Sequence, residues 1–596
     1  MADLILIQGS GDRTQDRRVA AIAAALGIEA RVVTAAEIRG AAVRPGPGSN
    51  LDRRCLALSA EALAEISDDS GTDVARAAAA SWGCAGLLVY GCTESAKQIA
   101  ALERLTGGAV AHVSTVREPS PRIAFPLEAR SLSQQLAGVE LAGTHGNSMS
   151  TFDVPAKPGE AMVAVTANGR PVLMRLMLAS LEVFLYSGPV ADVTQSVDRS
   201  YRLADDYDAI VPLLVFLRGF FGESCWHASQ SAARLTIDDP LLGRTYGFMD
   251  FGALHRSMQR AGYGATIGFI PWNAWRTSRS GARRLSAGRH EMTLCIHGCD
   301  HINKEFTSSD GDLLRRRAKL AVRRMEALSR RTGATVDRVM VFPQGLFSMA
   351  APAALRASGY LGAVNSSCIP IDSDRSLTLR DLLKPAVGRY GGFPVFGRRD
   401  PGPLADFAID LFLGKPALIV AHHEDFRSGY DPLETLVTGL REAEPHLTWP
   451  PLGSLLSASG LERRAPIGHT EFEFFTPVFR MSPAQGRDSH VVLHRYEPAP
   501  SLVSNVLVDG VDSPYTVDGD YLRLELDLDA AAPHVIEVID SRTQAGVTNG
   551  FGLLHNARVA ARRVLSEFRD NVLSRHQSAA KSARTLARAM RLTGDS

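Results

Sequence analysis

The chain has 596 residues, enough for two to four domains with large buried cores. Its hydrophobic fraction of 45% and charged fraction of 22% are ordinary for a globular protein and exclude a wholly disordered chain. The net charge of +1 provides no global field that would attract nucleic acid, so we expect no nucleic-acid partner and only local basic surfaces.

Cysteines, the N-terminus and the longest apolar run indicate the cellular setting. The seven cysteines are sparse and odd in number, which argues against a disulfide framework. Residues 1–7 lack the basic region of a signal peptide, so we expect a cytoplasmic protein. The apolar run 210–221 is shorter than the roughly 20 residues that span a bilayer. It contains Pro212 and Arg218, and we interpret it as a buried helix with no transmembrane segment.

Residues 1–195 alternate apolar strands with helices, which predicts a doubly wound, flavodoxin-like α/β domain. Cys92 follows an apolar strand that ends at Gly91, and residues 161–188 have the pattern of closing strands. In these features the segment resembles class I glutamine-amidotransferase-like domains. The elbow pattern G-x-C-x-G is not met, so a small buried core residue is the favoured interpretation of Cys92. We expect a binding or assembly domain, followed by a helical linker over 196–229.

Two short motifs after the linker carry the strongest chemical signal. Asp238 and Asp239 follow the apolar strand 233–237, and His297 and His301 lie four residues apart about sixty positions later. A helix or tight turn aims two such imidazoles at one point. Two imidazoles and one carboxylate can hold a divalent metal with a position left for water. The alternative is that the two aspartates cap a helix and the histidines are ordinary polar residues.

The order of these motifs resembles the polysaccharide deacetylase superfamily over residues 230–455, which includes carbohydrate esterases and the nodulation-factor deacetylase homology domain. The family motif T-F-D-D-G corresponds to residues 236–240, and H-[ST]-x-x-H corresponds to residues 297–301. The resemblance implies a deformed (β/α) barrel. It further implies that Asp238 is the catalytic base and that Asp239, His297 and His301 are metal ligands.

Two further family motifs are present in altered form. The motif R-P-P-[YF]-G corresponds to residues 341–345, which keep Pro343 and Gly345 but lose the arginine that steadies the base. Gln344 is a candidate neutral donor in its place, and the resemblance assigns residues 343–345 to the substrate, with a backbone N–H near Gly345 for an oxyanion. The motif L-x-H corresponds to residues 417–425, where His422 is the expected general acid and His423 the alternative. A non-catalytic histidine that ends a buried strand would give the same pattern.

Trp272 and Asn273 follow the apolar strand that begins at Ala265. A tryptophan face stacks on sugar rings and an asparagine amide can bind hydroxyl or acetamide groups, so we predict that both contact substrate. A tryptophan packed beneath a loop is the alternative.

The last third of the chain has a different sequence pattern. Residues 466–545 alternate apolar and polar positions with Asp-Gly turns, which predicts a β-sandwich. Residues 551–596 have a net charge of about +6 and predict a helix whose one face carries Ala557, Ala561, Val564, Leu565, Phe568 and Val572. This helix could contact an anionic membrane surface or an acidic protein, or simply dock with its polar face in solvent.

The sequence therefore predicts a metal-dependent hydrolase that removes acetyl groups from an N-acetylated saccharide or sugar precursor. The expected metal is zinc, although the ligand types also admit manganese, cobalt or nickel. Hydrolysis of other non-peptide C–N bonds is an alternative, because the missing motif arginine weakens the sugar assignment. A non-catalytic scaffold or binding protein that retains the fold is another.

Overall fold

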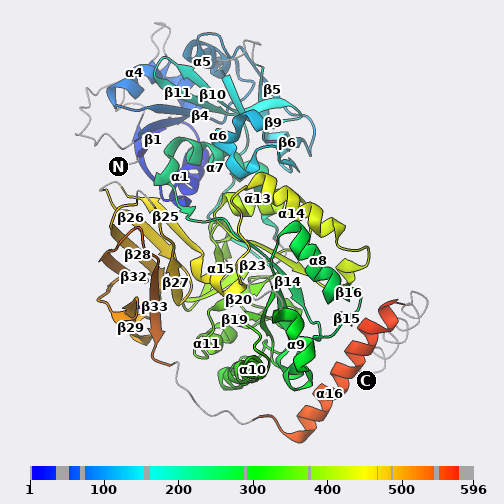
Figure 1. Cartoon of the computed structure of the whole chain (residues 1–596). Coiled ribbons are helices and arrows are strands. Elements are labelled where there is room, and N and C mark those ends of the chain that lie inside the picture. The colour runs from blue at the N-terminus through cyan, green and yellow to red at the C-terminus, as the bar shows by residue number, and fades with distance from the viewer. Residues whose placement is uncertain are drawn as a thin grey trace, which may run out of the picture.

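The structure is a computed structural model of the chain, and it describes residues 3–34, 53–67, 74–153, 161–199, 201–286, 292–373, 377–465, 468–484, 487–542 and 550–575. Figure 1 shows three regions of sheet: an N-terminal sheet with its helices, a central ring of strands, and a pair of small sheets beside the ring. The predicted segments 35–52 and 576–596 of the first and last regions lie outside the described residues.

The N-terminal sheet has nine strands in the order β2-β1-β3-β4-β11-β10-β9-β6-β7. Its first four strands and β11 are parallel, and the remaining strands pair antiparallel. In β1, Leu4 and Leu6 pack on the side of one helix layer while Ile5 and Ile7 pack on the other, so the strand is apolar throughout. The strands are β1 (Asp3–Gln8), β2 (Glu29–Thr34), β3 (Cys55–Ser59), β4 (Gly86–Tyr90), β6 (Arg122–Ala124), β7 (Glu140–Ala142), β9 (Ala161–Ala167), β10 (Arg170–Leu178) and β11 (Leu181–Tyr186).

Helices cover both faces of this sheet: α1 (Thr14–Ala25) lies on one face, and α3 (Ala60–Ile66), α4 (Val74–Ser81) and α5 (Ala96–Thr106) lie on the other. Cys92, just after β4, is buried, and burial raises the pKa of its thiol far above the ordinary range. A buried, protonated thiol is a poor nucleophile, which agrees with its interpretation as a core residue.

Helix α7 (Tyr207–Phe221) joins the N-terminal sheet to the barrel and is buried along almost its whole length. It lies in one core with α1 and with Ile409 and Phe412 of α13 (Leu404–Phe412), a helix of the central ring. The prediction of a buried helix over the apolar run is confirmed.

The central ring has eight strands in the order β22-β23-β20-β19-β18-β17-β14-β24, all parallel except the hairpin partner β22. Beyond the hairpin with β22, a bridge between Arg399, which follows β23, and Ile419 in β24 closes the ring, so the strands form a barrel. The strands are β14 (Ala233–Asp238), β17 (Ala265–Phe269), β18 (Met292–His297), β19 (Val336–Val341), β20 (Gly362–Asn365), β22 (Ala386–Tyr390), β23 (Phe393–Gly397) and β24 (Ala417–Ala421).

Outer helices surround this barrel and supply the second half of its core: α8 (Phe251–Ala261), α9 (Arg279–Ser286), α10 (Gly311–Thr332), α11 (Ala350–Arg356), α13, α14 (Asp431–Ala443) and α15 (Leu452–Ala458). Because the strands are parallel, their carboxyl ends lie at one end of the barrel, and this is where Asp238 and His297 occur.

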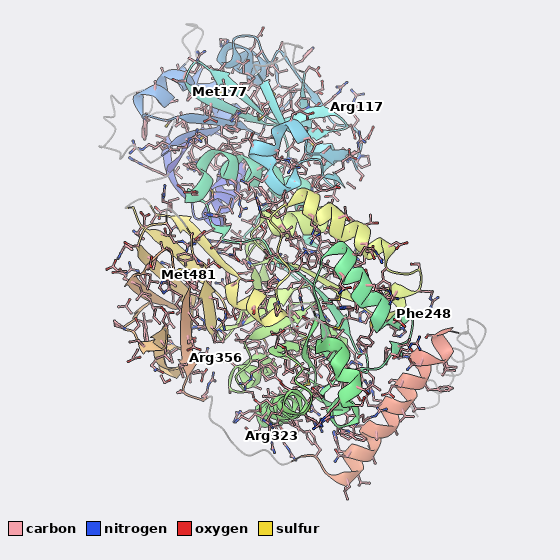
Figure 2. The ribbon with its side chains drawn as sticks, in the orientation of Figure 1. Arg117, Met177, Phe248, Arg323, Arg356 and Met481 are labelled. Carbon is pink, nitrogen blue, oxygen red and sulfur yellow. The ribbon has the colours of Figure 1, made fainter. Side chains whose placement is uncertain are left out.

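The two remaining larger sheets pack around a shared apolar core. One has the order β13-β25-β26-β28-β32-β31 and the other β27-β33-β29-β30. Arg356, labelled in Figure 2, extends from α11 to Glu497 at 2.7 Å and Asp540 at 2.6 Å, which ties these sheets to the barrel. Their strands are β13 (His227–Ala228), β25 (Gly460–Arg464), β26 (Thr470–Phe474), β27 (Val478–Met481), β28 (His490–Tyr496), β29 (Val503–Val508), β30 (Val511–Asp512), β31 (Thr516–Asp518), β32 (Tyr521–Asp527) and β33 (His534–Asp540).

Helix α16 (Leu553–Asn571) crosses the outside of the barrel near α9 and the small hairpin of β15 (Thr245–Tyr246) and β16 (Met249–Asp250). Within the described part of the chain, no helix combines the length and apolarity needed to cross a membrane.

Candidate metal centre

The two aspartates at the end of β14 point in different directions. Asp238 continues the strand and is buried, whereas Asp239 has a φ of 78°, in the left-handed region that aspartate tolerates better than most residues. This turn directs the Asp239 side chain toward the histidines of the next motif. Gly268 of β17 pairs with Asp238, and a Cβ there would lie 2.5 Å from Asp238 Oδ1. A glycine is therefore needed at this position to leave room for the carboxylate.

The two histidines lie on a tight turn after β18. His297 is its last strand residue, Gly298 has a φ of 66°, and His301 has a φ of 55°. The buried carboxylate of Glu305 holds this turn: Oε2 accepts from the N–H groups of Cys299 at 3.0 Å and His301 at 3.1 Å, and Oε1 accepts from Asp300 N–H at 2.8 Å. Glu305 thus fixes the path of the backbone between the two imidazoles.

Asp239, His297 and His301 converge on one point. Asp239 Oδ1 lies 3.4 Å from His297 Nε2 and 3.1 Å from His301 Nε2. His297 Nδ1 is 3.1 Å from the Val341 carbonyl, which fixes the proton on Nδ1 and turns the Nε2 lone pair toward Asp239. Burial lowers the pKa of His301 to about 3, so that imidazole is neutral.

These three groups fit a small divalent cation. Asp239 Oδ1 is buried without a hydrogen-bond partner, although two ring nitrogens lie close to it. Ligands about 2 Å from a tetrahedral ion are about 3.3 Å apart, close to the distances found here. One carboxylate and two imidazoles are also a ligand type that zinc binds, with a further position available for water.

A second group of potential ligands, Cys299, Asp300 and Glu305, lies beside the first. Its carboxylates already have protein partners: Glu305 holds the turn, and Asp300 accepts from Arg324 at 2.5 Å and lies 2.8 Å from His555 Nε2. We therefore interpret this second group as structural.

Asp238 is held by Arg398, a residue that the sequence analysis missed. The guanidinium donates to Asp238 Oδ1 at 2.9 Å and Oδ2 at 2.5 Å, and also to Thr236 Oγ1 at 3.2 Å. Burial raises the pKa of Asp238, but the Arg398 guanidinium and the neighbouring His297 outweigh burial and keep the pKa below its ordinary value. Asp238 is therefore an ionised proton acceptor in a fixed orientation.

Arg398 thus gives Asp238 an arginine partner that residues 341–345 do not supply, and the suggestion that Gln344 holds this carboxylate is not borne out. Gln344 Oε1 instead accepts from Lys304 N–H at 3.0 Å, on the loop after the histidine turn. Gly345 N–H donates to the Phe342 carbonyl at 3.0 Å. The N–H group that we expected to bind an oxyanion therefore already has a partner in its own turn. Pro343 is buried against the position of Gly298.

His422 and His423 follow β24 and face opposite ways. Ile237 pairs with Ala421, so the next position places His422 beside Asp238 and on the same face of the sheet. His422 is exposed, whereas His423 is buried with its ring against Tyr246 and against Phe248, which is labelled in Figure 2. The register favours His422 as the histidine that lies near Asp238 at the carboxyl ends of the strands.

Helix α16 brings a polar face toward Asp239 and the histidine turn. Asp570 accepts from the Tyr246 hydroxyl at 2.7 Å and lies 3.6 Å from His423 Nε2. Arg563 is buried. Burial raises the pKa of Asp239, but the neighbouring His301 and His297 rings and the Arg563 guanidinium outweigh burial and lower the pKa below its ordinary range. The helix therefore contributes an arginine to the electrostatics of the site.

Trp272 and Asn273 lie under this helix. Trp272 is buried in a small core with Val559 of α16, and Arg324 lies over its ring at 5.1 Å. Asn273 is buried, and its Oδ1 lies 3.4 Å from Arg276 NH1. With α16 in place, neither side chain is presented to a substrate, and the structure does not bring them to the ligand set. Their contact with a sugar stays a prediction.

No model of a known protein family and no curated protein matches this chain. Among solved structures, the chain is similar to Agd3, a carbohydrate deacetylase, with 11% identity over 90% of this chain and 98% of that one, at a TM-score of 0.49. A family 4 carbohydrate esterase from Streptomyces lividans shows 14% identity over 37% of this chain and 92% of that one, at a TM-score of 0.23. A family 4 pseudoenzyme, BA3943 from Bacillus anthracis, shows 13% identity over 37% of this chain and 64% of that one, at 0.25. At these values the similarities carry no weight for the function of this chain, whose site is judged by its own geometry.

Proposed function

We propose that the chain is a metal-dependent hydrolase that removes acetyl groups from an N-acetylated saccharide or sugar precursor. The observation that carries this proposal is the convergence of Asp239 Oδ1 with the Nε2 atoms of His297 and His301, next to the Asp238–Arg398 pair. Such a site holds a metal ligand set and a separate ionised base, which are the two parts that hydrolysis of an acetamide requires. The motifs at residues 236–240 and 297–301 supply the assignment to acetylated sugars.

Asp239, His297 and His301 would hold the cation, and zinc fits them best. When bound, such an ion polarises a carbonyl and lowers the pKa of a water molecule. Asp238 takes the proton of the attacking water, and Arg398 keeps its carboxylate ionised and oriented. His422 gives a proton to the leaving nitrogen as the C–N bond breaks. The products are acetate and a free amino group.

Arg398 also bears on the alternative of non-sugar C–N hydrolysis. The lost motif arginine was the reason to doubt the sugar assignment, and Arg398 fills that role from the segment after β23. The deacetylase interpretation therefore needs no neutral substitute at Gln344.

The test combines metal analysis of the purified full chain with acetate release from N-acetylated amino-sugar monomers and oligomers. We expect Asp238→Asn to retain the metal but lose most of its activity, typically about a hundredfold or more for a general base. His301→Ala should lose both the metal and the activity. The matched control is His446→Ala, because His446 is an exposed histidine in the loop after α14. This variant should retain both the metal and the activity.

Full activity in Asp238→Asn would contradict the assigned roles. Bound metal without acetate release from any acylated substrate would instead favour a scaffold protein that retains the fold.

A further inference from the structure

Helix α16 has a polar face that is already occupied by the barrel. His555, Val559, Arg563 and Asp570 recur at intervals of four or seven residues, and a helix places such residues on one side. Val559, Arg563 and Asp570 are buried, and His555 pairs with Asp300. Both acidic residues of the helix bind residues of the barrel: Asp570 accepts from the Tyr246 hydroxyl, and Glu567 accepts from Arg276 at 2.5 and 2.8 Å.

The opposite face is apolar and exposed. Leu554, Leu565, Phe568 and Val572 are spaced by 11, 3 and 4 residues, so at 100° per residue they form one stripe. Their exposed fractions are 80%, 69%, 52% and 41%. Six of the fourteen exposed large apolar side chains among the described residues lie between Leu553 and Val572, so this stripe stands out from the rest of the described surface. The apolar face that the sequence predicted is real, but it faces away from the protein.

Basic side chains border this stripe. Arg558 is exposed, Arg562 is half-buried, and Arg569 is exposed although its Nε donates to Asp570 Oδ1 at 2.6 Å. By the same angular count, all three lie along one side of the stripe, between it and the barrel-facing residues. The acids, by contrast, both face the barrel. In sequence, residues 576–596 add Lys581, Arg584, Arg588 and Arg591 against the single acid Asp595. The outer surface of α16 is therefore apolar along its middle and positive along its side.

We propose that the outer face of α16 binds an anionic membrane surface, lying in the plane of the interface. An apolar stripe bordered by arginines matches the acyl boundary and the negative headgroups of such a membrane. The helix is about 28 Å long at about 1.5 Å per residue, and its inner polar face stays on the barrel, so it lies on the bilayer rather than across it. Pairing with a second copy would bring two sets of arginines together, which charge repulsion opposes.

Co-sedimentation of the full chain with lipid vesicles tests this proposal. The probes are vesicles of phosphatidylcholine alone and of phosphatidylcholine mixed with phosphatidylglycerol. The variant Leu565→Glu/Phe568→Glu changes two exposed side chains, so the fold does not depend on them. Met177→Glu is the matched control, because Met177 is 50% exposed and lies on the N-terminal sheet, at the other end of the molecule from α16 (Figure 2).

We expect binding to the mixed vesicles that weakens at high salt, little binding to phosphatidylcholine alone, and at least about tenfold weaker binding of the double variant. The control should bind like the unchanged chain. The proposal is overturned if the chain ignores both vesicles or if the double variant binds as well as the control. It is equally overturned if sedimentation without lipid shows a dimer that the double variant dissociates, since a second copy would then cover the stripe.

Discussion

At the scale of single residues, Arg398 determines the protonation state of Asp238, the proposed base. Without its guanidinium, burial would dominate and the pKa of Asp238 would rise above its ordinary value. Because the proposed reaction needs an ionised Asp238, we expect Arg398→Gln to move the acidic limb of kcat/KM to higher pH by at least about one unit while the metal stays bound. Arg398→Lys keeps the charge without the two-pronged geometry and should shift the limb less. The pH dependence of acetate release measures both variants.

An unchanged acidic limb in Arg398→Gln, with metal retained, would show that another group is the base. Circular dichroism of both variants separates this result from unfolding, because removing one partner of a buried ion pair is also destabilising.

Glu305 holds the turn that carries the two proposed histidine ligands. Its carboxylate accepts from three successive N–H groups of the histidine turn, and a glutamine has only one acceptor oxygen and directs an NH2 group toward these donors. We expect Glu305→Gln to weaken zinc affinity by about 10 to 100-fold, as changes to the groups that orient ligands commonly do. Competition with a chelating dye measures the affinity.

Glu326→Gln is the matched control, since Glu326 is a surface glutamate of α10 that pairs with Arg338 of β19. Equal zinc affinity in the two variants would mean that the turn holds its shape without Glu305.

At the scale of elements, the segment after β23 both closes the barrel and supplies Arg398. The backbone of Arg399 bonds to β24 on both sides, and its side chain binds Asp410 of α13 at 2.8 and 3.1 Å. Lys415 lies 3.0 Å from the same carboxylate. This ion-paired cluster therefore fixes the strand end from which Arg398 reaches Asp238.

Asp410 should make stability depend on pH. Burial raises its carboxyl pKa, but Arg399 and Lys415 outweigh burial and lower the pKa from 3.8 to about 2. A carboxyl with a lowered pKa stabilises the fold fully above its unfolded pKa and loses this contribution as pH falls through its folded pKa. The difference corresponds to about 2 kcal/mol at neutral pH.

We therefore expect Asp410→Asn to lower the free energy of unfolding by about 2 kcal/mol at neutral pH and by about half as much near pH 3. Urea titrations of both proteins across this range measure it. A difference that stays constant, or that grows as pH falls, would contradict the ion-pair explanation.

Sequence alone could predict the elements that carry local patterns. The strands that became β14 and β18 end in compact motifs, so Asp238, Asp239, His297 and His301 were recognisable and do come together. Arg398 lies 160 residues from Asp238 and has no motif around it, so only the closed barrel shows their pairing. In α16 the apolar period indicated the wrong face, because this helix docks through His555, Arg563 and Asp570 rather than through its hydrophobic stripe. Burial of Trp272 under α16 depends on the same docking.

At the scale of the whole molecule, α13 connects the N-terminal sheet to the barrel. Phe412 belongs to the core shared with α7 and the N-terminal sheet, whereas Phe407, on the same helix, belongs to the barrel core. Both rings are fully buried. A helix with one face in each core makes it costly for either region to unfold alone.

We therefore expect Phe412→Ala and Phe407→Ala each to cost about 3–5 kcal/mol and to shift one common unfolding transition. Calorimetry reports the number of transitions, and amide exchange in β1 and β14 follows the two regions separately. Because α13 belongs to both cores, Phe407→Ala should accelerate exchange in β1 although it touches only the barrel. The contrary result is two transitions, of which Phe407→Ala moves only one, with exchange in β1 unchanged. The two regions would then unfold independently, and the candidate metal centre would not depend on the N-terminal sheet for its stability.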